Sequence, residues 1–215
     1  MAYHADNGIS CHRGVFIVIE GCDKIGKTTQ CLKLVESLNE HGIPCEYMSF
    51  PDRHTEVGKI IDKYLKREIE VENEVIHLLF SANRWELKCV MKKKLLDGVS
   101  IVADRYSYSG LAYSAAKPEW CWNTEIGLLQ PDVAVFFYVN GTVSLSREKY
   151  GLERYEVLDF QEKVKANFKR IKFLRSMIIG DNDDMNVIHY RLFRIAKEVI
   201  DIVQNAQLNS FTNPV

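Results

Sequence analysis

The sequence predicts an α/β fold in which a central parallel sheet is covered by helices on both faces. Short apolar runs rich in β-branched residues alternate with longer segments of helical spacing, as in repeated strand–helix units. The segment Gly21–Thr28, with the spacing G-x-x-x-x-G-K-T, joins the first apolar run to the first helical segment. The chain has 215 residues, of which 47% are hydrophobic, enough for one domain with a sizeable core.

Five strands are predicted from short apolar runs that end at polar or turn-forming residues. The second run ends at Pro51, which has no backbone N–H to donate to a sheet. The last candidate is short and lies near the C-terminus. The predicted strands are Val15–Glu20, Glu46–Phe50, Val99–Ala103, Val133–Val139 and Met185–Ile188.

Helices are predicted between these strands from spacing, caps and breakers. Thr55 is a suitable N-cap with Glu56 in the first turn, Gly98 ends a long helix, and Pro118 ends another. No repeat or linker divides the chain, so we expect a flexible leader at 1–13, a single domain at 14–206 and a polar tail at 207–215. The predicted helices are Thr28–His41, Thr55–Lys66, Glu70–Asp97, Ser107–Lys117, Phe160–Met177 and Arg191–Gln204.

Composition excludes several classes of protein. A formal net charge of −1 gives no overall attraction to nucleic acid or to an anionic membrane, so we expect neither as a partner. No apolar run is long enough to span a membrane, and residues 1–12 lack the features of a signal or transit peptide. We therefore expect a cytoplasmic location, with the nucleus as a second one.

The six cysteines are scattered without a C-x-x-C pair, which predicts neither a zinc site nor a redox dithiol. Cysteines of this kind inside a cell are usually reduced and act as small hydrophobic residues. Cys22 lies within the glycine-containing loop, where it is either filler or an oxidisable thiol.

The glycine-containing loop has the chemistry of a phosphate-binding loop (P-loop). A loop between a strand and a helix turns backbone N–H groups and the positive helix end toward an anion. Gly21 and Gly26 allow backbone angles and a close approach that a Cβ would obstruct. Lys27 can reach the β- and γ-phosphates of a nucleotide, and Thr28 can offer its hydroxyl to Mg²⁺. The alternative is a chance match in a glycine-containing loop.

Further charged residues follow two of the predicted strands. Asp104 and Arg105 come directly after the third strand, at the sheet edge where ligands of α/β folds bind. The carboxylate can hold Mg²⁺ directly or through water, and the guanidinium can take a phosphate bidentately. Arg53 follows the second strand and suits a second phosphorylated substrate. The alternatives are a surface salt bridge and a solvated loop arginine.

Phe80 and Arg84 are four residues apart and so share one face of the predicted third helix. A ring and a guanidinium one turn apart can stack on a flat heterocycle and hydrogen-bond its carbonyl edge. The alternative is that Phe80 belongs to the core while Arg84 extends to water.

Three cations, Arg147, Lys149 and Arg154, cluster near Gly151 and Tyr155 in a polar stretch between two elements. Such a stretch can form a mobile lid whose cations close over a transferring phosphoryl group and exclude water. A solvated run of charges is the alternative.

Together these motifs resemble the thymidylate kinases of the eukaryotic type, a P-loop nucleoside monophosphate kinase family. The SANRWE and DRY-x-x-SG-x-AY blocks are specific to that family, whereas the P-loop is not. The matching segments are collinear from about Gly14 to Gln161: Phe16–Gln30, Phe50–Lys59, His77–Glu86, Val102–Lys117, Pro131–Val135 and Glu153–Gln161.

The resemblance implies a P-loop kinase fold with a lid at about 141–156. It implies Mg²⁺-dependent phosphoryl transfer from ATP to dTMP, giving dTDP in dTTP biosynthesis, by a homodimer whose small-molecule partners are dTMP and ATP. Arg53 and Arg105 would hold the acceptor phosphate, Phe80 would stack on thymine, and Arg84 would reach a ring carbonyl. Tyr106 would press on the sugar.

Roles for individual residues are carried over onto the matching positions. Asp23, Lys24, Lys27 and Arg105 are implied as catalytic, and Gly21, Gly26, Lys27, Thr28 and Thr29 as binding the ATP phosphates. Thr28 and Asp104 are implied for the metal. The implied dTMP-binding set is Asp23, Phe50, Arg53, Phe80, Arg84, Arg105, Tyr106, Ser109, Gly110, Tyr113, Tyr155 and Gln161, with the last two closing over the base.

The chain departs from the family pattern in three places. Lys24 stands where eukaryotic members often carry arginine, which keeps the charge but loses the planar fork. The lid before Glu153 matches loosely, and the segment 178–191 matches poorly. In the family that segment contacts the donor base, so the preference for ATP over GTP stays open.

Three rival functions remain. A deoxynucleoside kinase shares the P-loop, but its acceptor carries no phosphate, and Arg53 with the SANRWE block favours a monophosphate. A regulatory GTP switch needs an N-K-x-D motif, which the sequence lacks. A catalytically inactive P-loop scaffold would not need Lys27, Thr28 and Asp104, all of which are present.

Overall fold

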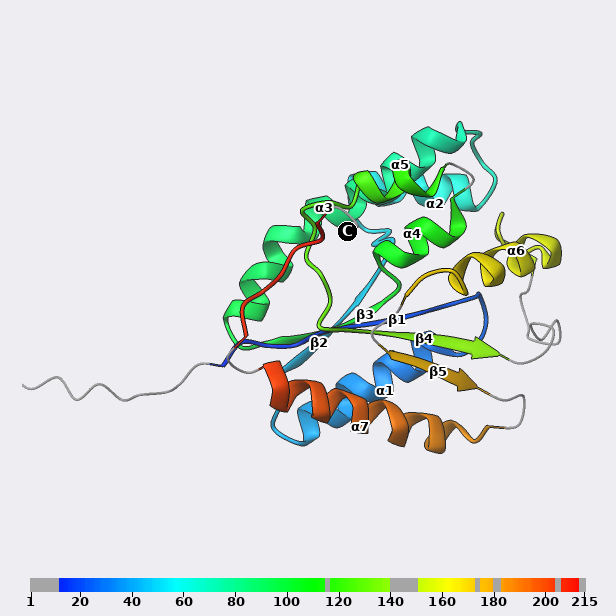
Figure 1. Cartoon of the computed structure of the whole chain (residues 1–215). Helices are drawn as coiled ribbons and strands as arrows, with labels where there is room; N and C mark the ends of the chain where they lie inside the picture. Colours follow the sequence, from blue (N-terminus) through cyan, green and yellow to red (C-terminus); the bar gives the residue numbers. More distant parts are fainter. Residues whose placement is uncertain are drawn as a thin grey trace, which may run out of the picture.

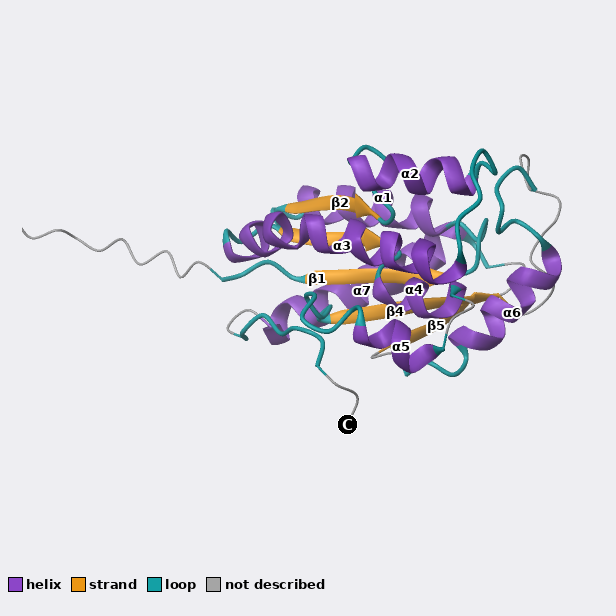
Figure 2. Ribbon diagram, turned by 90° about the horizontal axis from the view of Figure 1, so that it is seen from above, coloured by secondary structure: helices purple, strands orange, loops and turns teal. Residues whose placement is uncertain are grey.

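The computed structural model describes residues 12–114, 117–139, 151–172, 175–179, 183–203 and 206–212. Within them one parallel sheet has five strands in the order β2-β3-β1-β4-β5. Figure 2 shows the strands running in one direction toward the side where α6 lies. The strands are β1 (Phe16–Gly21), β2 (Cys45–Ser49), β3 (Ser100–Asp104), β4 (Val133–Val139) and β5 (Arg175–Ile179).

Helices cover both faces of the sheet, as the sequence predicts. Figure 1 shows α1 and α7 packed together on one face and the other helices on the opposite face or beside it. None of the described helices is long and apolar enough to cross a membrane. The helices are α1 (Lys27–Glu40), α2 (Glu56–Leu65), α3 (Asn73–Leu96), α4 (Ser107–Tyr113), α5 (Pro118–Asn123), α6 (Leu158–Phe168) and α7 (Met185–Val203).

The central strand β1 explains why the sheet is buried on both sides. All six of its residues are buried, and they include the apolar run Phe16–Ile19 that the main core surrounds. That core extends from Val15 to Phe211 in sequence, and a smaller cluster lies between α2 and α3. A fully buried strand has no polar face, so it reads as a continuous apolar run rather than an alternating one.

The sheet register brings three strand ends to the same level. Asp104 at the end of β3 pairs with Ile19 of β1 and with Ser49 of β2. The residues that follow these strands therefore meet at one edge. They are the P-loop after β1, Phe50 after β2, and Arg105 after β3.

Local signals place several helix ends correctly. The Thr55 hydroxyl accepts the backbone N–H of Gly58 at 2.9 Å and caps α2, with Glu56 in the first turn. Gly98, with φ of +85°, follows α3 in the left-handed conformation that glycine favours.

The C-terminal third differs from the prediction. The helix predicted over Phe160–Met177 ends at Phe168, and Arg175–Ile179 forms the edge strand β5. Met185–Ile188, predicted as the last strand, is the first turn of α7, because Asp184 accepts the backbone N–H of Asn186 at 2.6 Å and begins the helix. Periodicity alone does not separate a short buried strand from part of a helix.

Two other boundaries also differ. The helix predicted over Ser107–Lys117 ends at Tyr113, and Pro118 begins a separate helix, α5. The predicted polar tail instead docks, because Phe211 is only 3% exposed and bonds through its backbone to Gly127 and Leu128.

The leader is also anchored within its described part. The Arg13 guanidinium pairs bidentately with Asp132, at 2.6 and 2.8 Å. Arg13 also donates to the carbonyl of Ala206. Arg13 therefore links Ala206 to the start of β4, at the opposite end of the sheet from the P-loop.

Candidate active site

The P-loop needs its two glycines for different reasons. Gly21 has φ of +145°, and a Cβ there would lie 2.7 Å from the carbonyl oxygen of Phe137. Gly26 has φ of +90° and is the residue before α1. Lys27, the first residue of α1, is only 5% exposed, and its ammonium donates to the carbonyl of Cys22. Burial, reinforced by the charge of Arg105, lowers the pKa of Lys27.

Thr28 and Asp104 meet beside the P-loop. The Thr28 hydroxyl donates to Oδ2 of Asp104 at 2.5 Å, while the buried Oδ1 of Asp104 has no hydrogen-bond partner among the described residues. An unpartnered carboxylate oxygen next to a hydroxyl fits Mg²⁺, which prefers oxygen ligands. The described residues contain no group of three or more His, Cys, Asp or Glu that could hold a metal. Phosphate and water oxygens are the usual further ligands of Mg²⁺.

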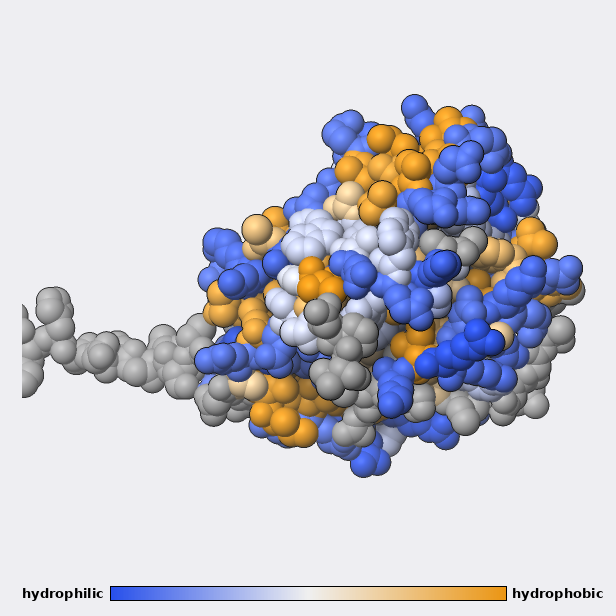
Figure 3. Space-filling view, turned by 45° about the horizontal axis from the view of Figure 1, so that its top comes forward, coloured by the Kyte–Doolittle hydropathy of each residue, from blue (hydrophilic) through white to orange (hydrophobic). Residues whose placement is uncertain are grey.

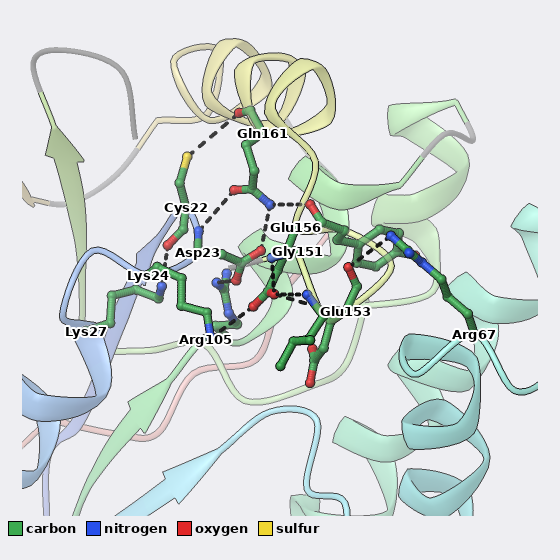
Figure 4. Close-up of polar contacts among 12 residues, drawn as sticks. Cys22, Asp23, Lys24, Lys27, Arg67, Arg105, Gly151, Glu153, Glu156 and Gln161 are labelled. Carbon is green, nitrogen blue, oxygen red and sulfur yellow. Dashed lines mark hydrogen bonds and ion pairs between the residues drawn. The ribbon is translucent and has the colours of Figure 1, made fainter. Parts of the chain in front are cut away.

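Asp23 and Arg105 form the centre of the site (Figure 4). Besides this ion pair, Arg105 donates to the Gly21 carbonyl at 2.8 Å. Asp23 accepts from the Tyr113 hydroxyl at 3.1 Å and from the Gln161 amide at 2.6 Å. Burial alone would raise the pKa of Asp23, but the charge of Arg105 holds it below its ordinary value. The Asp23 carboxylate is thus ionised and fixed.

Glu20, for which the sequence predicts no role, fixes the segment that follows Arg105. Its fully buried carboxylate accepts the backbone N–H groups of Tyr106 and Ser109, at 2.9 and 3.1 Å, and also the Ser109 hydroxyl. These contacts cap the start of α4 and fix the turn in which Arg105 has φ of +69°. Burial raises the pKa of Glu20. The sequence signal for Glu20 is an acidic residue at the end of an otherwise apolar strand.

A cavity of about 290 Å³ opens from this edge toward α2 and α3. Thr28 and Asp104 lie on its wall, so the cavity reaches the two residues that would hold Mg²⁺. Of the predicted dTMP-binding residues, all except Gln161 line it: Asp23, Phe50, Arg53, Phe80, Arg84, Arg105, Tyr106, Ser109, Gly110, Tyr113 and Tyr155. Gln161 is fully buried behind Asp23, so the structure does not bring it to the base side.

Phe80 and Arg84 both face the cavity from α3. Arg84 does not extend to water, because it is 2% exposed and its guanidinium pairs with the fully buried carboxylate of Glu125. Tyr155 also lines the cavity, with its ring parallel to that of Phe160 at a centroid distance of 4.8 Å. The cavity therefore has an aromatic region and a cationic one.

Arg53 lies on the cavity wall and is held by two carboxylates. Its guanidinium contacts Asp62 of α2 at 2.7 Å and Glu153 at 2.8 Å. Both acids are partly exposed, so these are ion pairs of modest strength. The two ion pairs fix the position of the Arg53 guanidinium, and its side chain stays partly exposed.

Of the three predicted lid cations, Arg154 lies within the described residues. Arg154 donates to the carbonyls of Tyr64 and Ile69 and pairs with Glu70, and it stacks over the Tyr64 ring. Its guanidinium is thus bound to the end of α2 and does not face the P-loop. Arg147 and Lys149 lie outside the described residues.

Lys24 connects the P-loop to the end of the lid segment (Figure 4). Its ammonium lies 3.0 Å from Oε1 of Glu156, whose Oε2 accepts the backbone N–H groups of Gly151 and Leu152. Lys24 has φ of +58°, an uncommon conformation for a residue with a side chain. Thr29 lies one residue beyond Thr28, exposed in the first turn of α1.

Comparison with known proteins shows the family of this chain. The sequence model of the family described as thymidylate kinase matches residues 19–190. The chain belongs to the thymidylate kinase family. It is 47% identical to the thymidylate kinase of Danio rerio over 167 residues, covering 76% of this chain and 79% of that protein. It is 42% identical to the Homo sapiens thymidylate kinase over the same shares of both chains.

A solved structure and a further sequence relative agree. The thymidylate kinase of Candida albicans superposes with a TM-score of 0.84 at 31% identity, covering 93% of this chain and 99% of that one. The thymidylate kinase of Schizosaccharomyces pombe is 39% identical over 207 residues, or 92% of this chain. The P-loop kinase fold predicted from the sequence is therefore confirmed.

The thymidylate kinase site also contains acids that no motif identified. Glu20, Glu125 and Glu156 each hold a functional group through side-chain contacts between segments far apart in sequence. Glu20 and Glu156 lie within matched blocks, but their contacts with Tyr106 and Lys24 could not be read from spacing. The segment 178–191 lies partly outside the described residues.

Proposed function

We propose that this thymidylate kinase transfers the γ-phosphoryl group of ATP to dTMP with Mg²⁺, producing dTDP for dTTP biosynthesis. The observation that carries the proposal is one continuous cavity. It joins Thr28 and Asp104 at the P-loop to Phe80 and Arg84 on α3. Such a cavity suits an acceptor nucleotide whose phosphate end meets the P-loop, where phosphoryl transfer depends on positioning and charge neutralisation.

On the donor side, the backbone N–H groups of the P-loop and Lys27 bind the ATP phosphates, with Thr29 in the same first turn. Thr28 and Asp104 would hold Mg²⁺, which neutralises phosphate charge when bound. Lys24 can exchange its contact with Glu156 for an oxygen of the transferring group, since both are anions. A lysine does this as a point charge, with less geometric control than an arginine.

On the acceptor side, Arg53 and Arg105 hold the dTMP phosphate, and Asp23 fixes Arg105. An ionised phosphate oxygen attacks without a strong general base. Phe80 stacks on thymine, and Tyr106 packs against the sugar.

Arg84 contacts a ring carbonyl. Thymine differs from uracil by one methyl group, which is worth only about 1–3 kcal/mol in an apolar pocket. We therefore expect some phosphorylation of dUMP.

A coupled ADP-release assay with ATP and Mg²⁺ tests the function directly. We expect dTMP to be the best acceptor among dTMP, dUMP, dCMP and thymidine. Faster turnover of thymidine would establish a deoxynucleoside kinase instead, and nucleotide binding without turnover would establish an inactive scaffold. Repeating the assay with GTP determines the donor preference that the segment 178–191 leaves open.

Arg53→Ala is expected to raise the KM for dTMP roughly 10- to 100-fold, the range for one hydrogen-bonded charge contact. The KM for ATP should stay unchanged, because Arg53 lies on the acceptor side. Arg67→Ala is the matched control, since Arg67 is an exposed arginine near the same Glu153. Unchanged dTMP kinetics in Arg53→Ala would remove Arg53 from the acceptor site.

We also propose that the enzyme is a homodimer that packs through α3. Val75, Leu78, Ala82, Trp85 and Cys89 recur at spacings of three and four, which places them on one helix face. Leu78 is 46% exposed. Figure 3 shows apolar residues gathered at the top of the molecule, where Figure 1 places α2, α3 and α5. An exposed apolar stripe of this kind favours association.

Sedimentation equilibrium tests the dimer. We expect twice the chain mass for the wild type and the single mass for Leu78→Glu. Leu32→Glu, at an equally exposed leucine of α1, should leave the dimer intact. A monomeric wild type at micromolar concentration would exclude it.

We further propose a cytoplasmic enzyme, present also in the nucleus. All five cysteines among the described residues are free, which suits a reducing compartment. Cell fractionation with an antibody to the chain tests this location.

A further inference from the structure

Glu125 and Gly110 confine the guanidinium of Arg84 on two sides. Glu125 accepts from Nε at 2.8 Å and from Nη2 at 2.5 Å. A Cβ on Gly110 would lie 2.7 Å from Nη2 and 3.3 Å from Cζ, so the backbone of α4 lies directly against the guanidinium. Among the described residues, no hydrogen-bond acceptor is found for Nη1, and Arg84 lines the cavity.

Glu125 is itself fixed relative to α3. The neighbouring Thr124 is bound to that helix by three side chains. Its hydroxyl contacts Nε2 of His77 at 3.0 Å, and its carbonyl accepts from Ser81 at 3.0 Å and Trp85 at 2.9 Å. Glu125 is 0% exposed, and the charge of Arg84 holds its pKa below the ordinary value although burial acts to raise it. The ion pair is therefore rigid and fully charged.

We infer that Glu125 is a positioning residue that fixes the Arg84 guanidinium for the ring carbonyl of the base, and thereby determines how strongly the cavity favours dTMP over dCMP. The pairing uses two nitrogens of the guanidinium and leaves Nη1, which only donates, as the group available to the base. A donor facing a carbonyl forms a charge-assisted hydrogen bond, whereas a donor facing an amino group leaves both unpaired. Glu125 is a positioning residue here, since it contacts Arg84 and not the substrate. The inference rests on the proposed phosphorylation of dTMP.

The test compares kcat/KM for dTMP and for dCMP in the wild type and in variants. Glu125→Asp shortens the carboxylate by one methylene, and Gly110→Ala displaces the guanidinium from the other side. In both variants we expect the ratio of dTMP to dCMP to fall roughly 10- to 100-fold, the range for one hydrogen bond to a charged group. The loss should appear mainly in the KM for dTMP.

Asp132→Asn is the matched control. It weakens another bidentate arginine–carboxylate pair, with Arg13, at the far end of the sheet. We expect a lower melting temperature with an unchanged substrate ratio. If Glu125 had a purely structural role, Glu125→Asp would also lower the melting temperature and leave the dTMP-to-dCMP ratio unchanged.

An unchanged dTMP-to-dCMP ratio in Glu125→Asp would overturn the inference. If that variant does not fold, the ratio in Gly110→Ala decides in the same way. A wild type that does not phosphorylate dTMP would instead reject the proposed function, so the two failures are distinguishable.

Discussion

Lys27→Ala is expected to lower kcat for dTMP phosphorylation by at least ~100-fold, the effect of removing one group that stabilises charge in the transition state. Lys27 is the first residue of α1, and its ammonium lies within the curve of the P-loop at the Cys22 carbonyl. From there the ammonium can reach phosphate oxygens, whose negative charge the backbone N–H groups alone would neutralise incompletely. Single-turnover measurements with saturating ATP and dTMP measure this loss.

The fold should survive the same change. Burial disfavours the charged form of Lys27 and lowers its pKa, and Asp23 keeps its ion pair with Arg105 when the Lys27 ammonium is removed. Thermal unfolding should therefore remain close to that of the wild type. Lys33→Ala, at another lysine of α1, is the matched control and should keep full turnover. Near-native turnover in Lys27→Ala would reject the assigned role of the P-loop.

Arg105→Met is expected to lower kcat/KM for dTMP by roughly 100- to 1000-fold. Arg105 joins the Gly21 carbonyl of the P-loop to the Asp23 carboxylate and lies on the cavity wall. Its loss removes a phosphate contact and also releases Asp23, so both the binding of dTMP and its alignment should suffer. Steady-state kinetics with varied dTMP measures both parameters.

The same substitution should also lower the melting temperature, because the Asp23 carboxylate would keep only its contacts with Tyr113 and Gln161. The double variant Arg105→Met with Asp23→Asn separates the two effects. It should regain stability, since no unpaired carboxylate remains, yet stay inactive. Recovery of turnover in that double variant would mean that Arg105 acts only by neutralising Asp23.

The sequence predicted the sheet edge well because its signals are local. Gly21, Gly26 and Lys27 follow one strand at fixed spacing, and Asp104 and Arg105 follow another. Parallel strands bring such residues together whatever the rest of the fold does. Phe80 and Arg84 needed only a correct helix to share a face, and the cavity lies on that face.

The errors fall where tertiary contacts override local pattern. Arg175–Ile179 is a strand because β4 offers it an edge to pair with. Phe211 is buried because Tyr106, Tyr108 and Trp122 surround its ring. A window of sequence contains no information about these distant partners.

By itself the sequence determined the fold class, the phosphate loop and most of the side chains around the cavity, because backbone geometry and spacing fix them. Only the tertiary structure decided what each charged group faces. Arg154 binds the end of α2, Gln161 holds Asp23, and Arg84 is fixed by Glu125. The physical reason is that a buried charge must find a partner, and that partner is chosen by the packing of segments far apart in the chain.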